Sequence, residues 1–281
     1  MNPIDLQLLR DFLLTALRED IGSGDITSRS AIPADARGVA RVMTKEAMTV
    51  AGLSVAAEVA RLLDANCAVV FGVSDGATVG ERALLAEIRG SAPSLLTAER
   101  TILNLLQRMS GIATLTRQYV DRVQGTKARI IDTRKTAPGL RLLDKYAVTC
   151  GGGMNHRTGL FDGVLIKNNH LAFHASSAHA IRAARRHVGH LMKIEIEVHY
   201  LDELLNVIEA GADVVLLDNF TPEQTRHAVE LAGGRIPLES SGGITLQNVR
   251  EYAEAGVDYI SIGALTHSVP AVDIHMRIAP E

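Results

Sequence analysis

The sequence is poor in cysteine and has no tryptophan. Its two cysteines, Cys67 and Cys150, lie far apart and show neither CxxC spacing nor a histidine partner at the spacing of a metal site. A disulfide framework is therefore not expected, and the protein is predicted to work in the reducing cytoplasm. Asp5, Arg10 and Asp11 interrupt the first leucine-rich stretch, so we do not expect a secretory signal peptide there.

Long apolar runs and an excess of charge of one sign are also missing. No apolar run approaches the roughly 20 residues of a membrane span. The 29 lysines and arginines nearly balance the 32 acids, which gives a formal net charge of −3. This balance argues against nucleic acid or an anionic membrane as the main partner. A Walker loop and a GxGxxG motif are absent, so neither a nucleoside triphosphate nor a dinucleotide is indicated.

The first part of the chain predicts a compact α+β sandwich domain. Leucines at positions 6, 9, 13 and 17 recur at helical spacing after the N-cap Asp5, and the helix is expected to end before Gly22. Strand-like runs at residues 39–43, 68–71 and 83–88 flank one helix at 54–63. A long helix at 94–123, with a kink or break at Ser110-Gly111, is expected to lead into a second domain.

The second part repeats a short β-branched run, a polar tip and a helix. The runs lie at residues 129–132, 163–167, 193–198, 213–218, 236–239 and 258–262. Alternation of this kind indicates parallel strands joined by right-handed crossovers. The sequence therefore predicts an α/β fold, an open TIM-like barrel of about six strands. We expect this barrel at residues 113–266, and the α+β domain at residues 1–112, joined by the C-terminal segment 267–281.

Charged or hydroxylated residues follow nearly every predicted strand, where a barrel of this kind has its active site. They are Asp132 with Arg134 and Lys135, Lys167 with Asn168, Glu195 with Glu197, Asp218 with Asn219, Glu239 with Ser240 and Ser241, and Ser261 with Gly263. Glu195 and Glu197 are two residues apart and point to the same side of their strand. Glu197 and Asp218 are candidate ligands for a Mg²⁺ ion, because their hard oxygens suit it when substrate phosphates complete its shell.

Two further features indicate a small polyanionic ligand. Residues 132–170 gather Arg134, Lys135, His156, Arg157, Lys167 and His170 around three consecutive glycines, Gly151–Gly153. Guanidinium groups match carboxylate and phosphate oxygens two at a time, whereas ammonium groups supply point charge. Glycine-bearing loops after the last two predicted strands, with Ser241, Gly242, Gly243 and Gly263, expose backbone N–H groups suited to a phosphate.

Several of these motifs together resemble one family. They are Glu19–Thr27, Ala98–Thr101, Asp132–Thr136 (DTRKT), Gly151–Arg157 (GGGMNHR), Leu165–His170 and Ser241–Ile244. Over nearly its whole length the chain resembles the quinolinate phosphoribosyltransferases, the carboxylating nicotinate-nucleotide pyrophosphorylases, which are type II phosphoribosyltransferases. One departure is Asn168, where the family pattern leads us to expect Asp.

The resemblance implies that quinolinate and phosphoribosyl pyrophosphate give nicotinate mononucleotide, pyrophosphate and CO₂, with Mg²⁺ as cofactor. It also implies roles for individual residues and a homodimer or higher homo-oligomer with shared active sites. Quinolinate would be held by Arg134, His156, Arg157 and Arg100, the last from a neighbouring subunit. Lys135, Lys167, Glu197 and Asp218 would face phosphoribosyl pyrophosphate and its metal, and Ser241, Gly242, Gly243 and Gly263 would bind phosphate.

Two other functions fit parts of the pattern. In a Schiff-base aldolase on the same barrel, Lys167 would be the nucleophile at a strand end. In a non-catalytic regulator, the cations would bind an anion without chemistry. The presence of both Glu197 and Asp218 argues against the regulator, since carboxylates repel an anion.

Overall fold

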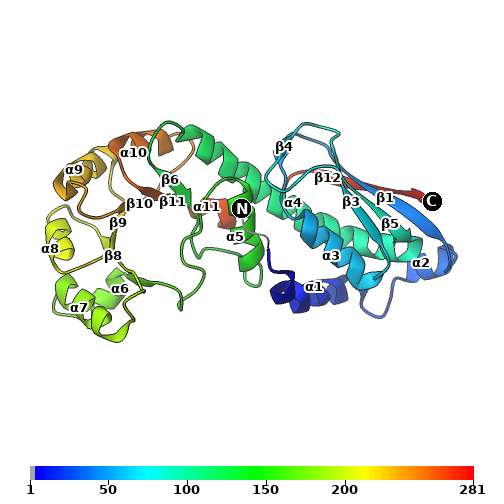
Figure 1. The fold of residues 1–281 in the computed structure, drawn as a ribbon, viewed down its shortest axis with the longest axis horizontal. Helices are drawn as coiled ribbons and strands as arrows, with labels where there is room; N and C mark the ends of the chain where they lie inside the picture. The colour runs from blue at the N-terminus through cyan, green and yellow to red at the C-terminus, as the bar shows by residue number, and fades with distance from the viewer. Residues whose placement is uncertain (1–3) are drawn as a thin grey trace. The chain divides into compact units, whose positions relative to one another are not determined.

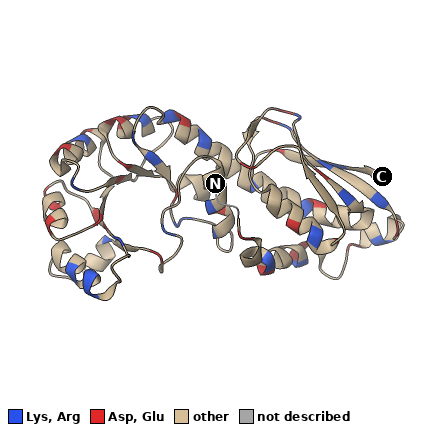
Figure 2. Ribbon diagram, viewed as in Figure 1, with Lys and Arg blue, Asp and Glu red and all other residues tan. Residues whose placement is uncertain are grey.

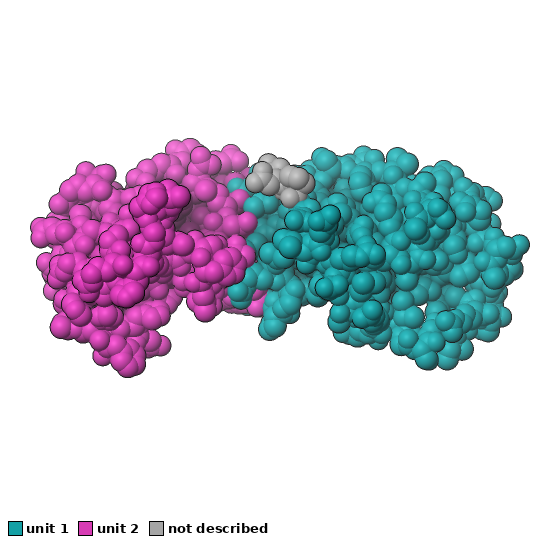
Figure 3. Space-filling model, turned by 60° about the horizontal axis from the view of Figure 1, so that its bottom comes forward, with its two compact units in different colours: residues 1–117, 137–152, 268–281 teal, residues 118–136, 153–267 magenta. Residues whose placement is uncertain are grey.

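The computed structural model describes residues 4–281 (Figure 1), which form two compact units (Figure 3). Unit 1 contains the chain up to Arg117, Ala137–Gly152 and Ser268–Glu281, and unit 2 contains Gln118–Thr136 and Gly153–His267. Residues 137–152, which the sequence analysis put in the barrel domain, thus belong to unit 1. Between residues 4 and 281, no helix combines the length and the apolarity needed to cross a membrane.

Unit 1 pairs an antiparallel sheet with helices. Its strands are β1 (Arg37–Thr44), β2 (Met48–Thr49), β3 (Ala68–Phe71), β4 (Thr78–Val79), β5 (Leu84–Ser91) and β12 (Ile274–Pro280), and its helices are α1 (Leu6–Ile21), α2 (Ile26–Ala31), α3 (Leu53–Leu63), most of α4 (Ala92–Arg122) and α5 (Arg141–Cys150). The main sheet has the order β12-β1-β5-β3, and β2 and β4 form a separate ribbon. The α+β architecture predicted for this part of the chain is confirmed.

The local signals in unit 1 explain its first helix. The Asp5 side chain accepts a hydrogen bond from the Gln7 backbone N–H at the start of α1, and Gly22 ends the helix with a positive φ of 52°. Leu9, Leu13 and Leu17 are its buried residues. Capping and spacing therefore predicted both the extent and the inward face of α1.

The long helix α4 contradicts one expectation. The break expected at Ser110-Gly111 is absent, because α4 runs without interruption over 31 residues. Ser110 instead bonds the backbone of Ala51 through its buried hydroxyl group. A Cβ added to Gly111 would collide with the carbonyl oxygen of Pro270. These two small residues therefore allow close packing inside a continuous helix rather than ending it.

Unit 2 is a parallel sheet of six strands, in the order β6-β11-β10-β9-β8-β7, with helices along the outside of its curve (Figure 1). The strands are β6 (Arg129–Ile131), β7 (Val164–Ile166), β8 (Ile194–Val198), β9 (Val214–Asp218), β10 (Leu238–Ser241) and β11 (Tyr259–Ser261). The helices are α6 (Asn168–Leu171), α7 (Ser177–His187), α8 (Glu203–Glu209), α9 (Pro222–Ala232), α10 (Val249–Ala255) and α11 (Ala264–His267). The predicted open α/β barrel is confirmed, and it opens between β6 and β7, which do not pair.

One strand begins later than the sequence analysis expected. The run at residues 236–239 predicted a strand there, whereas β10 covers Leu238–Ser241. Pro237 has no N–H to donate to a neighbouring strand, so it stands just before the strand. Ser240 and Ser241 are therefore strand residues rather than loop residues.

Charges of both signs occur on the helices outside the barrel and in unit 1 (Figure 2). This distribution agrees with the near balance of acidic and basic residues in the composition.

Candidate active site

A cavity of about 420 Å³ lies in unit 2, within the usual size range for a small-molecule site. Most of the residues that the sequence analysis selected line it: Arg134, Lys135, His156, Arg157, Lys167, Asp218, Ser241, Gly242 and Gly243. The strand-end residues Glu239 and Ser261 also line it, so the fold brings together selected groups that are up to 127 positions apart in the chain, from Arg134 to Ser261. Leu165 and Leu216 supply apolar surface to the same cavity.

Three other selected residues lie elsewhere. Glu197 reaches this group through Lys167, whose Nζ is 2.6 Å from Glu197 Oε2. Gly263 lies against Lys135, because a Cβ added to the glycine would be 3.0 Å from Lys135 Cδ. Arg100 is an exposed residue of α4 in unit 1.

Strand register accounts for the interior of the barrel. Glu197 in β8 pairs in register with Leu216 in β9, and Leu216 pairs with Glu239 in β10. Two residues further along, Asp218 pairs with Ser241, which pairs with Ser261. Residues side by side on neighbouring strands share a face, and so do residues two apart on one strand. These two rows of side chains therefore face the same interior.

The gap between β6 and β7 admits the segment that carries His156 and Arg157. Met154 forms an isolated parallel bridge with Ile131 of β6. The backbone N–H of His156 then donates to Asp132 Oδ1 at 2.8 Å, and Asp132 is fully buried. The motifs DTRKT and GGGMNHR are thus joined directly by a hydrogen bond.

Arg157 is held on the inside of this segment. Its Nη1 donates to the carbonyl oxygen of Gly163 at 2.9 Å, while its buried Nε has no hydrogen-bond partner among the described residues. Burial, followed by the charge of nearby Arg134, lowers the pKa of the Arg157 guanidinium. Two guanidinium groups close enough to repel each other are stabilised by an anion that both can bind.

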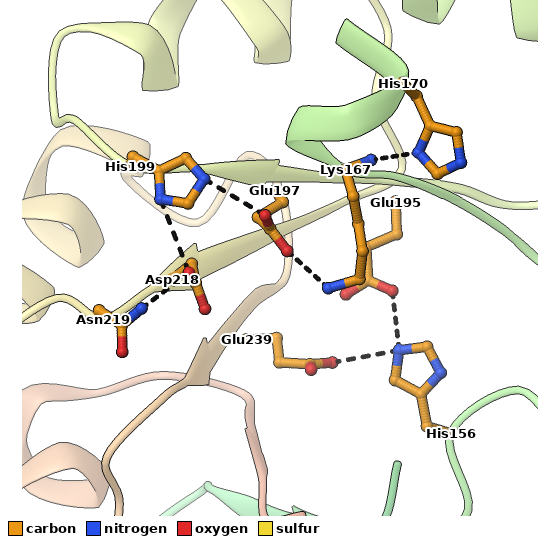
Figure 4. A network of polar contacts seen from close by, with 9 residues as sticks. All are labelled: His156, Lys167, His170, Glu195, Glu197, His199, Asp218, Asn219 and Glu239. Atoms are coloured by element: carbon orange, nitrogen blue, oxygen red, sulfur yellow. Dashed lines mark hydrogen bonds and ion pairs between the residues drawn. The ribbon is translucent and has the colours of Figure 1, made fainter. Parts of the chain in front are cut away.

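A second group surrounds Glu197 and Asp218 (Figure 4). His199 stands between them, with Nε2 at 3.2 Å from Glu197 Oε1 and Nδ1 at 3.6 Å from Asp218 Oδ2. Asn219 Nδ2 donates to Asp218 Oδ2 at 2.8 Å. His199 was not predicted as a site residue. Its signal was present, since Glu195, Glu197 and His199 follow one another at intervals of two.

A third group lies around His156 (Figure 4). Its Nε2 is 2.9 Å from Glu195 Oε2 and 3.8 Å from Glu239 Oε2. The two acids were noted as strand-end residues, but no role was assigned to them. Glu239 stands two positions before Ser241, so the same period of two places it on the inner face.

The loop after β10 has an unusual backbone. Gly242 and Gly243 have positive φ angles of 95° and 63°, and facing Asn219 also has a positive φ of 58°. A Cβ at Gly242 would overlap Asn219 Oδ1 and lie 2.7 Å from Asn219 Cγ. This position therefore requires glycine, and turns of this kind are suited to binding anions through their backbone N–H groups.

An open α/β barrel that gathers guanidinium groups, carboxylates and a glycine loop at its strand ends defines an enzyme that binds small, multiply anionic substrates. The model of the quinolinate phosphoribosyl transferase C-terminal domain matches residues 112–277, and that of the N-terminal domain matches residues 25–110. The chain belongs to the quinolinate phosphoribosyltransferase family.

Individual relatives are similar to this chain over nearly its full length. The chain is 44% identical to a probable nicotinate-nucleotide pyrophosphorylase [carboxylating] of Bacillus subtilis, covering 99% of this chain and 95% of the relative. It is 44% identical to the nicotinate-nucleotide pyrophosphorylase [carboxylating] of Mycobacterium leprae, covering 99% and 100%. The crystal structure of NadC from Streptococcus pyogenes is 37% identical and superposes with a TM-score of 0.96, covering 100% of both chains.

Proposed function

We propose that this chain transfers the phosphoribosyl group of phosphoribosyl pyrophosphate to quinolinate and releases CO₂, giving nicotinate mononucleotide for NAD biosynthesis. The main support for this proposal, besides membership of the family, is the lining of one cavity. A single cavity is lined by Arg134 and Arg157, which suit a dicarboxylate, and by Asp218 and Gly242-Gly243, which suit a phosphoribosyl group.

The cations would bind and orient quinolinate. Arg134 and Arg157 carry forked donors that match a carboxylate in its plane. His156 holds the backbone of Arg157 and so keeps this side of the cavity in shape. Orientation matters because the ring nitrogen must reach the ribose carbon in line with the departing pyrophosphate.

Glu197 and Asp218 would hold Mg²⁺ together with substrate oxygens. Their carboxylate oxygens and a ring nitrogen of His199 lie within 4.8 Å of one another, and hard oxygen donors fit this ion. When bound, it would stabilise negative charge on the phosphates. Lys135 and Lys167 line the same cavity and would place their ammonium groups near the leaving pyrophosphate.

The reaction needs no protein nucleophile. The bond from the ribose carbon to the pyrophosphate oxygen breaks while the quinolinate nitrogen forms a bond to that carbon. Positive charge builds on the ribose and negative charge on the leaving group, so carboxylates and ammonium groups act where charge changes. The ring carboxylate next to the nitrogen then leaves as CO₂, its electron pair stays on the ring carbon beside the cationic nitrogen, and a proton from water replaces it.

The aldolase alternative has less support. Lys167 Nζ lies 2.6 Å from Glu197 Oε2, with Glu197 buried. This ion pair engages the Lys167 nitrogen, whereas a Schiff base would require the same nitrogen to attack a carbonyl carbon. Lys167 is therefore better suited to a phosphate than to a carbonyl group.

We also propose that the enzyme is at least a homodimer in which Arg100 completes the quinolinate site of a neighbouring subunit. Its position on the exposed surface of α4 leaves the guanidinium accessible to another chain.

We further propose that the enzyme works in the cytoplasm. The thiols of Cys67 and Cys150 are buried and free, and they would stay reduced in that compartment.

A direct assay tests the proposed function. The purified protein is incubated with quinolinate, phosphoribosyl pyrophosphate and Mg²⁺, and nicotinate mononucleotide and CO₂ are measured. Formation of both in equal amounts is expected. No product, or trapping of a substrate on Lys167 by borohydride, would contradict the proposal.

A further inference from the structure

The proposed mechanism gives no role to two buried carboxylates, Glu195 and Glu239, that lie beside His156. His156, Glu195 and Glu239 place one ring nitrogen and two carboxylate oxygens within 4.8 Å of one another. Glu195 and Glu239 are only 8% and 2% exposed. Their Oε1 atoms are buried and lack a hydrogen-bond partner among the residues described. His156 and Glu239 also line the cavity of the site.

The hydrogen bonds of His156 determine which of its nitrogens carries the proton. The backbone N–H of Arg157 donates to Nδ1 at 2.7 Å, so Nδ1 accepts and carries no hydrogen. The ring proton is therefore on Nε2, which donates to Glu195 Oε2 at 2.9 Å. With one ring proton in use, His156 has none for Glu239, whose Oε2 is 3.8 Å from Nε2.

Two buried carboxylates so close together cannot both be ionised at low cost. Glu195 accepts a hydrogen bond from His156, whereas Glu239 is the more buried of the two acids and its Oε2 lies 3.8 Å from His156 Nε2, beyond hydrogen-bond distance. Burial, and then the charge of Glu195, raise the pKa of Glu239 well above its usual value. A proton on Glu239 also supplies a donor to an acid pair that has unsatisfied oxygens.

We propose that Glu239 is a positioning residue of the quinolinate subsite, which acts as an uncharged carboxyl group that holds Glu195 and, through it, the ring of His156. His156 in turn fixes the backbone of Arg157. The uncharged state also matters for the substrate, because a second buried anion would offset the attraction of Arg134 and Arg157 for the two carboxylates. This inference rests on the proposed function.

Two substitutions at one position separate the proposed role from general stability. Glu239→Gln keeps the shape and an uncharged hydrogen-bond donor, and Glu239→Ala removes both. Binding of quinolinate is measured by calorimetry, KM for both substrates and kcat by turnover, and folding by thermal unfolding. We expect Glu239→Gln to bind quinolinate within about twofold of the wild type. Glu239→Ala should bind it roughly tenfold more weakly, with KM for phosphoribosyl pyrophosphate changed by less than about twofold.

Each other outcome overturns the inference. If Glu239→Gln loses quinolinate affinity as much as Glu239→Ala, the charged carboxylate is needed. If Glu239→Ala binds quinolinate as the wild type does, or if both KM values rise together, Glu239 does not position this subsite. Wild-type protein that binds quinolinate but makes no nicotinate mononucleotide would refute the proposed function alone. Wild-type protein that does not bind quinolinate would refute both.

Discussion

Gly242 offers the sharpest test of the proposed phosphate-binding loop after β10. In Gly242→Ala the new methyl group must occupy a left-handed backbone position, which costs about 1–2 kcal/mol. It must also displace Asn219, whose Cγ would lie 2.7 Å away, and such overpacking costs a further ~1–3 kcal/mol. Because Asn219 donates to Asp218, the displacement disturbs the proposed site for phosphoribosyl pyrophosphate as well as stability.

Gly243 is the matched control for this substitution. It also has a positive φ, of 63°, but nothing lies within 4 Å of an added Cβ. Gly243→Ala should therefore show only the backbone cost, and Gly242→Ala should unfold at a temperature lower by at least about 3 °C. KM for phosphoribosyl pyrophosphate is expected to rise roughly tenfold more in Gly242→Ala than in Gly243→Ala.

A double substitution decides whether Asn219 is the cause. In an Asn219→Gly background the colliding side chain is gone and, of the nearest atoms, only the backbone N of residue 219, at 3.1 Å, stays close to the added Cβ, so most of the difference in cost between Gly242→Ala and Gly243→Ala should disappear. Calorimetric unfolding gives the unfolding temperature of each variant, and steady-state kinetics give its KM for phosphoribosyl pyrophosphate. Equal losses for the two alanine variants in the wild-type background, or a Gly242→Ala cost that Asn219→Gly does not relieve, would refute the assignment.

Three further experiments test the division of roles. Arg134→Ala should weaken quinolinate binding roughly a hundredfold, since a charged hydrogen-bonding partner is lost, whereas Glu197→Ala should leave it nearly unchanged; calorimetry showing equal losses would contradict this. Inactive Arg100→Ala and Lys135→Ala chains, when mixed, should regain about a quarter of wild-type activity through composite sites, and no recovery despite demonstrated subunit exchange would argue against a shared site. Because the pKa of Glu239 is raised above its usual value of 4.5, the folded chain keeps a proton that the unfolded chain loses. Wild-type stability relative to Glu239→Gln should therefore fall as the pH rises above this usual value, and a constant difference in unfolding temperature would speak against a proton on Glu239.

The strands of unit 2 were predictable because buried parallel strands produce short β-branched runs with polar residues at their carboxyl ends. The run at residues 213–218 differs from β9 by only one residue. Pro237 shows the limit of the β-branched pattern. The apolar run includes this residue, but proline has no backbone N–H for strand pairing, so β10 begins only at Leu238. The same holds for α4, where the small residues Ser110 and Gly111 serve packing that no single helix pattern reveals.

The candidate site was predictable where a motif carries its chemistry within a few residues, as DTRKT does. The acid pair Glu195 and Glu239 was not, because 44 positions separate the two residues and their interaction depends on the sheet order β10-β9-β8. His199 could have been found by extending the period of two beyond the strand. The role of Arg100 depends on a second chain and stays a prediction.

The pairing of β12 with β1 affects how the chain is made. The main sheet of unit 1 receives its edge strand only when Ile274–Pro280 has been synthesised, whereas all of unit 2 precedes Ser268. During synthesis β1 therefore carries an unpaired edge while more than two hundred residues are added, from Thr44 to Ile274. Domains usually fold in the order of synthesis, but here the barrel can be complete before the sheet that begins the chain. Truncation after His267 is thus expected to leave an exposed strand edge that favours aggregation.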